Sequence, residues 1–131
     1  MFEAEWSLDN KPHTRTKLEI FKKYFDVWLK IWNNQNWVSN TWYYIDLYSG
    51  RGIHNYKGEN CYGSPLIFLD QLRNKLTDNS VEFKSSLNIH MFLVEEDKRT
   101  FTCLKENVDA FLQENPVVSN FVSIYYFNND C

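Results

Sequence analysis

Acidic side chains follow three apolar segments of this sequence, each at the point where a β-strand would end. Asp46, with Gly50 and Gly52 close behind it in the stretch YYIDLYSGRG, ends the first segment. Glu95 ends the second segment and Asp130 the third. If the three segments are parallel strands of one sheet, their carboxyl ends meet at one edge, where open α/β sheets bind ligands. We therefore expect these acids and glycines to form a single site.

The combination fits S-adenosylmethionine better than a dinucleotide. A dinucleotide turn needs a third glycine that leads directly into a helix, but Asn55 occupies that position and no helix is expected there. S-adenosylmethionine carries a sulfonium, an ammonium and a carboxylate, and it has no phosphate that an acidic edge would repel. Asp46 could face the ammonium, Glu95 could accept both ribose hydroxyls, and Asp130 could bond the adenine amino group.

Each of these features also has a structural interpretation. The glycines could form only a tight turn, since short motifs occur often by chance. Glu95 to Asp97 could be the acidic first turn of a helix, an interpretation that suffices for Asp97. Asp130 could be solvated near the end of the chain. Three neighbouring residues are credible substitutes in the predicted site: Glu96, Asn128 and Asn129.

The elements that would position these residues alternate between helix and strand. Apolar residues at steps of three and four predict helices, and short apolar runs predict strands. We predict a helix from Thr14 to about Asn33, a strand at 42–47, a loop at 48–63, a helix at 64–76, a strand at 88–96, a helix at 98–114 and a strand at 121–127. Ser64 is the expected N-cap and Pro65 the first helical residue. This alternation predicts an α/β fold, a Rossmann-like doubly wound parallel sheet.

The last predicted strand bears on domain organisation. Because a domain seldom ends at a fresh strand with nothing after it, we expect the chain to be truncated. Residues 1–12 are expected to form an N-terminal arm. Residues 13–131 are expected to form the N-terminal part of a Rossmann-like methyltransferase domain.

Composition excludes several classes of protein. The 131 residues are 44% hydrophobic and 18% aromatic, which is enough for one domain with a core. The net charge of −3 gives no overall field to attract nucleic acid, although a local basic patch is allowed. No apolar run is long enough to span a membrane, and the histidines lack zinc-ligand spacing. Three cysteines without a CxxC pair indicate reduced thiols in a cytoplasmic protein.

Four segments resemble the N-terminal half of the three-Cys-motif partner protein family: PHTRTKLEIFKKYFDVWLKIW, YYIDLYSGRG, GSPLIFLDQL and FLVEEDKRTFTCLKENV. This bacterial and phage family has a class I S-adenosylmethionine-dependent methyltransferase-like fold. The likeness covers about residues 12–110, and the GSP after the glycine loop is its most specific motif. The family is named after a separate protein that carries the three-Cys motif. The resemblance therefore implies such a partner, and the cysteines of this chain are not evidence for it.

Together, the strand-end pattern and the resemblance predict a set of cofactor-binding residues. They are Asp46, Tyr48, Ser49, Gly50, Gly52, Glu95 and Asp130. Tyr48 and Ser49 stand where the family usually has Phe and Ala. Arg51 stands where Pro is common, and it could pair either with the carboxylate of the cofactor or with Glu95.

The favoured hypothesis is an S-adenosylmethionine-dependent methyltransferase. Its methyl acceptor is unknown; by resemblance it would be a nucleic acid or a partner-bound substrate, and no catalytic base can be assigned. The alternative is a non-catalytic protein that keeps the fold and acts by association, because the aromatic segment WLKIWNNQNW suits an interface. A nicotinamide-dependent oxidoreductase is disfavoured by the missing third glycine.

Overall fold

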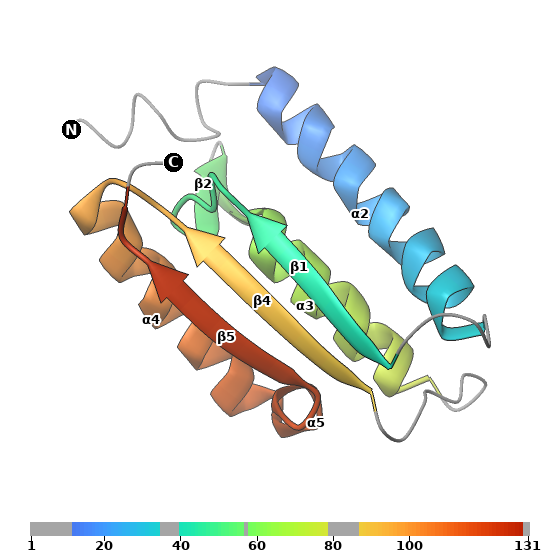
Figure 1. The fold of residues 1–131 in the computed structure, drawn as a ribbon. Coiled ribbons are helices and arrows are strands. Elements are labelled where there is room, and N and C mark those ends of the chain that lie inside the picture. Colours follow the sequence, from blue (N-terminus) through green and yellow to red (C-terminus); the bar gives the residue numbers. More distant parts are fainter. Residues whose placement is uncertain (1–11, 35–39, 57, 79–86, 130–131) are drawn as a thin grey trace.

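A three-stranded parallel sheet with helices forms the body of the protein. The computed structural model describes residues 12–34, 40–56, 58–78 and 87–129. Its elements are α2 (Pro12–Asn34), β1 (Thr41–Asp46), β2 (Ile53–Tyr56), β3 (Glu59–Tyr62), α3 (Ser64–Leu76), β4 (Asn88–Val94), α4 (Lys98–Glu114), α5 (Pro116–Ser119) and β5 (Val122–Phe127) (Figure 1). The parallel strands are in the order β1-β4-β5. The predicted α/β class and parallel sheet are confirmed.

The predicted loop at 48–63 was wrong in its second half. Residues 53–62 form the antiparallel hairpin β2–β3, which lies near the carboxyl ends of the parallel strands (Figure 1). Gly58, in the two-residue connection, has a φ of +86°, and its N–H donates to Asn55 Oδ1 at 3.1 Å. A glycine with positive φ is the usual requirement of such a short connection.

Ser64 is not the N-cap of α3, as we had predicted. Gly63 is the N-cap, and no side chain caps this end of the helix. The Ser64 hydroxyl donates instead to Asp46 Oδ2, 2.6 Å away. A hydroxyl that reaches a carboxylate forms a stronger hydrogen bond than a neutral capping interaction. Ser64 is therefore the first helical residue, one position earlier than predicted, and it bonds the helix to the end of β1.

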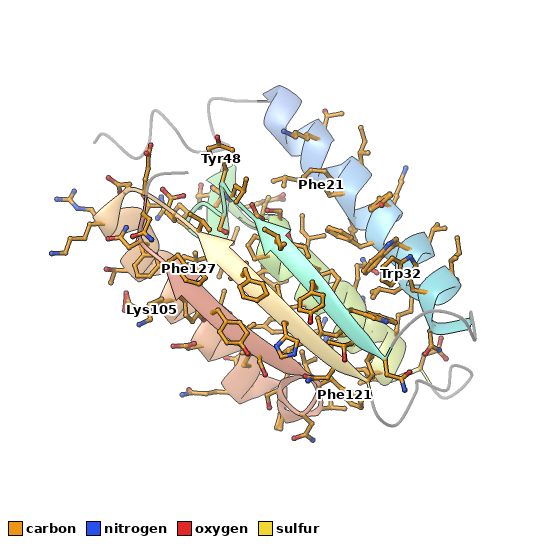
Figure 2. All side chains as sticks on the ribbon, in the orientation of Figure 1. Phe21, Trp32, Tyr48, Lys105, Phe121 and Phe127 are labelled. Carbon is orange, nitrogen blue, oxygen red and sulfur yellow. The ribbon has the colours of Figure 1, made fainter. Side chains whose placement is uncertain are left out.

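The three long helices α2, α3 and α4 cover one face of the sheet. The Trp42 ring of β1 lies 5.7 Å, between ring centroids, from both Trp28 and Trp32 of α2. Figure 2 labels Trp32 in this layer. The fully buried core is formed by Leu29, Trp42, Leu66, Phe68, Leu69, Leu72, Ile89, Met91, Leu93, Leu104, Val108 and Val118. The first two tryptophans of WLKIWNNQNW therefore pack toward the core, and Trp37 lies outside the described residues.

The opposite face of the sheet, called the open face below, has no helix over it within the described part of the chain (Figure 1). Its residues alternate along each strand with those that face the helices, and none is Asp, Glu, Lys or Arg. They are Thr41, Tyr43, Ile45, Asn88, His90, Phe92, Val94, Ser123, Tyr125 and Phe127. Rings stack across the strands, as Phe92 and Tyr125 do at 4.8 Å and 13°. Since parallel sheets are normally covered on both faces, such a face is typical of a surface that binds another layer.

Three further sequence expectations concern membranes, metals and thiols. None of the helices in the described ranges has the length and apolar character needed to cross a bilayer. The described residues contain no group of three or more metal-ligating side chains. Cys61 and Cys103 form no disulfide with each other, and Cys131 lies outside the described residues.

Candidate functional site

The end of β1 and the end of β4 lie side by side. Asp46 pairs in register with Leu93, so Glu95 lies two residues beyond the level of Asp46. A direct hydrogen bond links the two ends, because the Gly50 N–H donates to Glu95 Oε1 at 3.0 Å. The structure therefore brings together the glycine turn and Glu95, as expected for strand ends at one edge. Asp130 lies outside the described residues.

Glu95 is held in place and keeps spare acceptor capacity. Its Oε1 accepts from Gly50 and its Oε2 accepts the N–H of Asp97 at 3.1 Å. A carboxylate oxygen has about two acceptor positions, so each oxygen of Glu95 can accept one more hydrogen bond. Two hydroxyls on adjacent carbons, such as those of a ribose, match this remaining capacity.

Asp46 is more fully occupied. Its Oδ2 accepts the hydroxyls of Tyr44, at 3.1 Å, and Ser64, and its Oδ1 accepts the Tyr48 N–H at 3.1 Å. Burial, and then the charge of Asp46, raise the pKa of Tyr44 far above its ordinary value, so the phenol stays a donor. Three of about four acceptor positions are used. Asp46 therefore fixes the turn and the start of α3, and it retains one position for an ammonium or a water.

The turn itself is built from Ser49, Gly50 and Gly52. Ser49 is buried, its N–H continues the ladder to Val94 at 3.0 Å, and its hydroxyl donates to the Asp46 carbonyl. Gly50 and Gly52 have φ of +70° and +89°, a region that side chains other than glycine rarely adopt. A Cβ on Gly52 would lie 3.3 Å from the Cβ of Asn107 in α4. Gly52 is thus needed for packing, while Gly50 has more room.

Two predicted roles near the turn can be compared with its geometry. Arg51 does not pair with Glu95, since neither side chain forms an ion pair within the described ranges. Tyr48 is the most exposed residue of the turn, at 80% (Figure 2). Its contribution to the turn is therefore its backbone N–H, and its ring is accessible from solvent.

Residues after β4 and β5 complete the edge. Asp97 is the N-cap of α4 and accepts the Thr100 N–H at 2.8 Å, so this acid has a structural role, one residue before the first turn in which it was predicted. Hydrogen bonds from Thr100 hold the pKa of Asp97 below its ordinary value. The Asn128 amide donates to the carbonyls of Glu95 and Glu96, at 2.8 and 3.1 Å. Asn128 thereby ties the end of β5 to Glu95, and its Oδ1 remains an acceptor at the place predicted for an adenine contact.

Sequence reasoning missed Tyr44, and for His54 it favoured a solvated position in the loop. The Tyr44 hydroxyl binds Asp46, and the signal was their i, i+2 spacing, which puts both on one side of a strand. The His54 ring lies between two glycines of the turn region. Its Nε2 is 3.6 Å from where a Cβ of Gly50 would lie and 3.0 Å from that of Gly63. The absence of both side chains makes room for the imidazole.

Two hollows lie near this edge, and neither is lined by Asp46 or Glu95. A cavity of about 170 Å³ between α2, the hairpin and α3 is lined by residues that include Lys22, Tyr62 and Asp70. A more open hollow of about 410 Å³ runs along α4 to Asn128. The support for a ligand at the strand ends is therefore the hydrogen-bonding geometry of the turn.

Comparison of the chain with protein-family models, curated proteins and solved structures found no match.

Proposed function

We propose that this protein binds S-adenosylmethionine through the turn after β1 and the carboxylate after β4, and that it is part of a methyltransferase. The observation that carries the proposal is the state of Glu95. Two backbone N–H groups fix this carboxylate beside the glycine turn, and each of its oxygens keeps one acceptor position. The resemblance to the three-Cys-motif partner family supports the same assignment.

The residues present fit the charge pattern of this cofactor. Glu95 would hold the ribose hydroxyls, Asp46 would face the ammonium with its remaining acceptor position, and Asn128 Oδ1 would accept from the adenine amino group. Gly50 adopts the positive φ that brings its N–H to Glu95. When bound, the cofactor supplies an electrophilic methyl group, and this chain would contribute by positioning it.

The proposed fold is the doubly wound, Rossmann-like one. The strand order runs in one direction from β1 to β5, so both crossover connections place their helices on the same face. Helices on the open face would require the order to reverse, and that can happen only beside β1. The free side of β1 would then be the topological switch point, where ligands bind in such sheets. The glycine turn lies at that place.

A non-catalytic role by association is the second candidate, and two surfaces favour it. One is the uncharged open face. The other is a stripe on α2 formed by Ile20, Tyr24, Val27 and Ile31, each 51% to 61% exposed. Apolar surfaces of this kind mark interaction sites. A separate protein carrying the three-Cys motif is the partner that the family resemblance implies, and a nucleic acid is a possible methyl acceptor.

Isothermal titration with S-adenosylhomocysteine tests the proposal. We expect wild-type protein to bind it and Glu95→Gln to weaken binding by about tenfold or more, because a hydrogen bond to a charged group is lost. Glu96→Gln is the matched control, since it changes the neighbouring exposed acid and should leave affinity within about twofold. Circular dichroism of each variant shows whether the fold is retained.

The outcomes separate the two candidates. Folded wild-type protein that does not bind S-adenosylhomocysteine would refute the methyltransferase proposal and leave association as the better account. If S-adenosylhomocysteine binds and Glu95→Gln leaves its affinity unchanged, the ligand binds elsewhere. Equal loss in Glu95→Gln and Glu96→Gln would show that Glu95 makes no specific contact with the ribose.

A further inference from the structure

Arg51 is a cation in the middle of the glycine turn, and no described residue forms an ion pair with it. It is partly exposed, yet its Nε is shielded from solvent and has no hydrogen-bond partner in the described part of the chain. By contrast, Arg73 pairs with Asp70 and Lys75 with Asp26. A buried donor without an acceptor is costly and rare in native structures. The guanidinium therefore has a hydrogen-bond donor whose acceptor the described residues do not provide.

The backbone around Arg51 is fixed at three consecutive positions. The Gly50 N–H donates to Glu95, the Arg51 carbonyl accepts from Asn107 Nδ2 at 2.8 Å, and the Gly52 carbonyl accepts from the Gly63 N–H at 2.6 Å. These bonds join the turn to β4, to α4 and to the hairpin. The backbone position from which the Arg51 side chain extends is thus fixed beside the proposed cofactor site.

The nearby acids do not neutralise Arg51. Glu95 is bonded to the residue next to it and still makes no ion pair with the guanidinium. Asp46 is occupied by two hydroxyls and a backbone N–H. The preferred partner of a guanidinium is a carboxylate that it can bind through two parallel hydrogen bonds. The turn thus presents a cation suited to a carboxylate that comes from outside the protein.

We infer that Arg51 binds the α-carboxylate of the adenosyl cofactor and selects for ligands that carry it. This inference rests on the proposed function, and it assigns one chemical group of the cofactor to one side chain. The two charged groups at the amino-acid end of the ligand would then bind to different side chains. The ammonium would face Asp46, and the carboxylate would face Arg51, since the two acids of the site would repel it.

The test compares two ligands that differ only in the carboxylate. S-adenosylhomocysteine and its decarboxylated analogue, the adenosyl thiopropylamine, are titrated against wild-type protein and Arg51→Gln. We expect the substitution to weaken S-adenosylhomocysteine by about tenfold to a hundredfold, the range of a charge-assisted pair. The analogue should change by less than about threefold. Arg51→Lys should fall in between, because lysine keeps the charge and loses the planar fork.

Arg99→Gln serves as control, since Arg99 is an exposed arginine in the first turn of α4; it should affect neither ligand. Thermal melting establishes that the Arg51 variants are folded. If Arg51→Gln weakens both ligands equally, or neither, the carboxylate assignment is wrong although the cofactor site stands. If folded wild-type protein binds neither ligand, both the proposed function and this inference fail.

Discussion

Replacing Gly52 with alanine should destabilise the protein more than the same change at Gly50. Both residues have φ in the left-handed region, +70° at Gly50 and +89° at Gly52. The difference lies in their surroundings. A Cβ on Gly50 would meet the His54 ring at an ordinary contact distance of 3.6 Å. A Cβ on Gly52 would lie 3.3 Å from the Cβ of Asn107 in α4. A Cβ is bonded directly to the helix backbone, so no side-chain rotation can move it away.

The magnitudes follow from these two contributions. An alanine held at positive φ costs about 1 kcal/mol in either position, partly offset by the reduced freedom of the unfolded chain. Overpacking adds about 1–2 kcal/mol at Gly52 alone. We therefore expect a loss in the free energy of unfolding of roughly 1 kcal/mol for Gly50→Ala and roughly 2–3 kcal/mol for Gly52→Ala.

Urea unfolding followed by tryptophan fluorescence measures both losses, because Trp28, Trp32 and Trp42 form one cluster in the core. Gly58→Ala is the control for backbone strain alone: its φ is +86° and no heavy atom lies within 4 Å of the added Cβ. If Gly52→Ala costs no more than Gly58→Ala, the turn does not pack closely on α4. The structural explanation of the second glycine would then be wrong.

Three other predictions concern the rest of the fold. Asp26→Asn should lower the free energy of unfolding by about 1–3 kcal/mol because it leaves the buried Lys75 ammonium unpaired, whereas Lys75→Met should cost less in the same urea assay. Hydrogen bonding to Lys75 lowers the folded-state pKa of Asp26 below its ordinary 3.8. The stabilisation by this ion pair is therefore present above about pH 4 and is lost as the pH falls through the folded-state pKa. In acid titrations, the free energies of unfolding of wild type and Asp26→Asn should converge at low pH. Ser64→Ala should cost about 1–2 kcal/mol in thermal melting, since Asp46 loses a donor; no change would show that the link between β1 and α3 contributes nothing. Tyr125→Lys should leave the circular dichroism unchanged and reduce the fluorescence of a bound hydrophobic dye, because it puts a charge on the open face; undiminished dye fluorescence would show that this face is covered.

Local signals in the sequence explain what was predicted correctly. The bounds of α4 follow from its apolar periodicity and from the break at Asn115 and Pro116, and the structure has the helix at Lys98–Glu114 as predicted. The three strands follow from apolar runs of strand length. The hairpin was missed because its strands are short and only partly buried, so the alternation that marks strands is weak there.

The sequence predicted which residues of the candidate site lie near one another, but it did not predict the hydrogen bonds between them. Strand ends meet in a parallel sheet, and this alone placed Asp46 near Glu95. The bond that defines the site, from Gly50 to Glu95, joins residues 45 apart and depends on how the turn folds back over β4. The misplaced N-cap has the same origin: the hydroxyl of Ser64 has a carboxylate within reach that no local pattern reveals.

Strand β1 links the proposed chemistry to the exposed apolar surfaces. Its carboxyl end leads into the glycine turn, its outward side chains Tyr43 and Ile45 belong to the open face at 62% and 65% exposure, and within the described ranges it pairs with β4 alone. The helix that carries the exposed apolar stripe, α2, packs on the opposite side of the same strand, where Trp28 meets Trp42. A strand with apolar residues on both faces and neither proline nor lysine lacks the features that protect a natural sheet edge. Any polypeptide that adds a strand beside β1 would satisfy its free edge and form a second wall next to the turn, so association and cofactor binding would be coupled through β1.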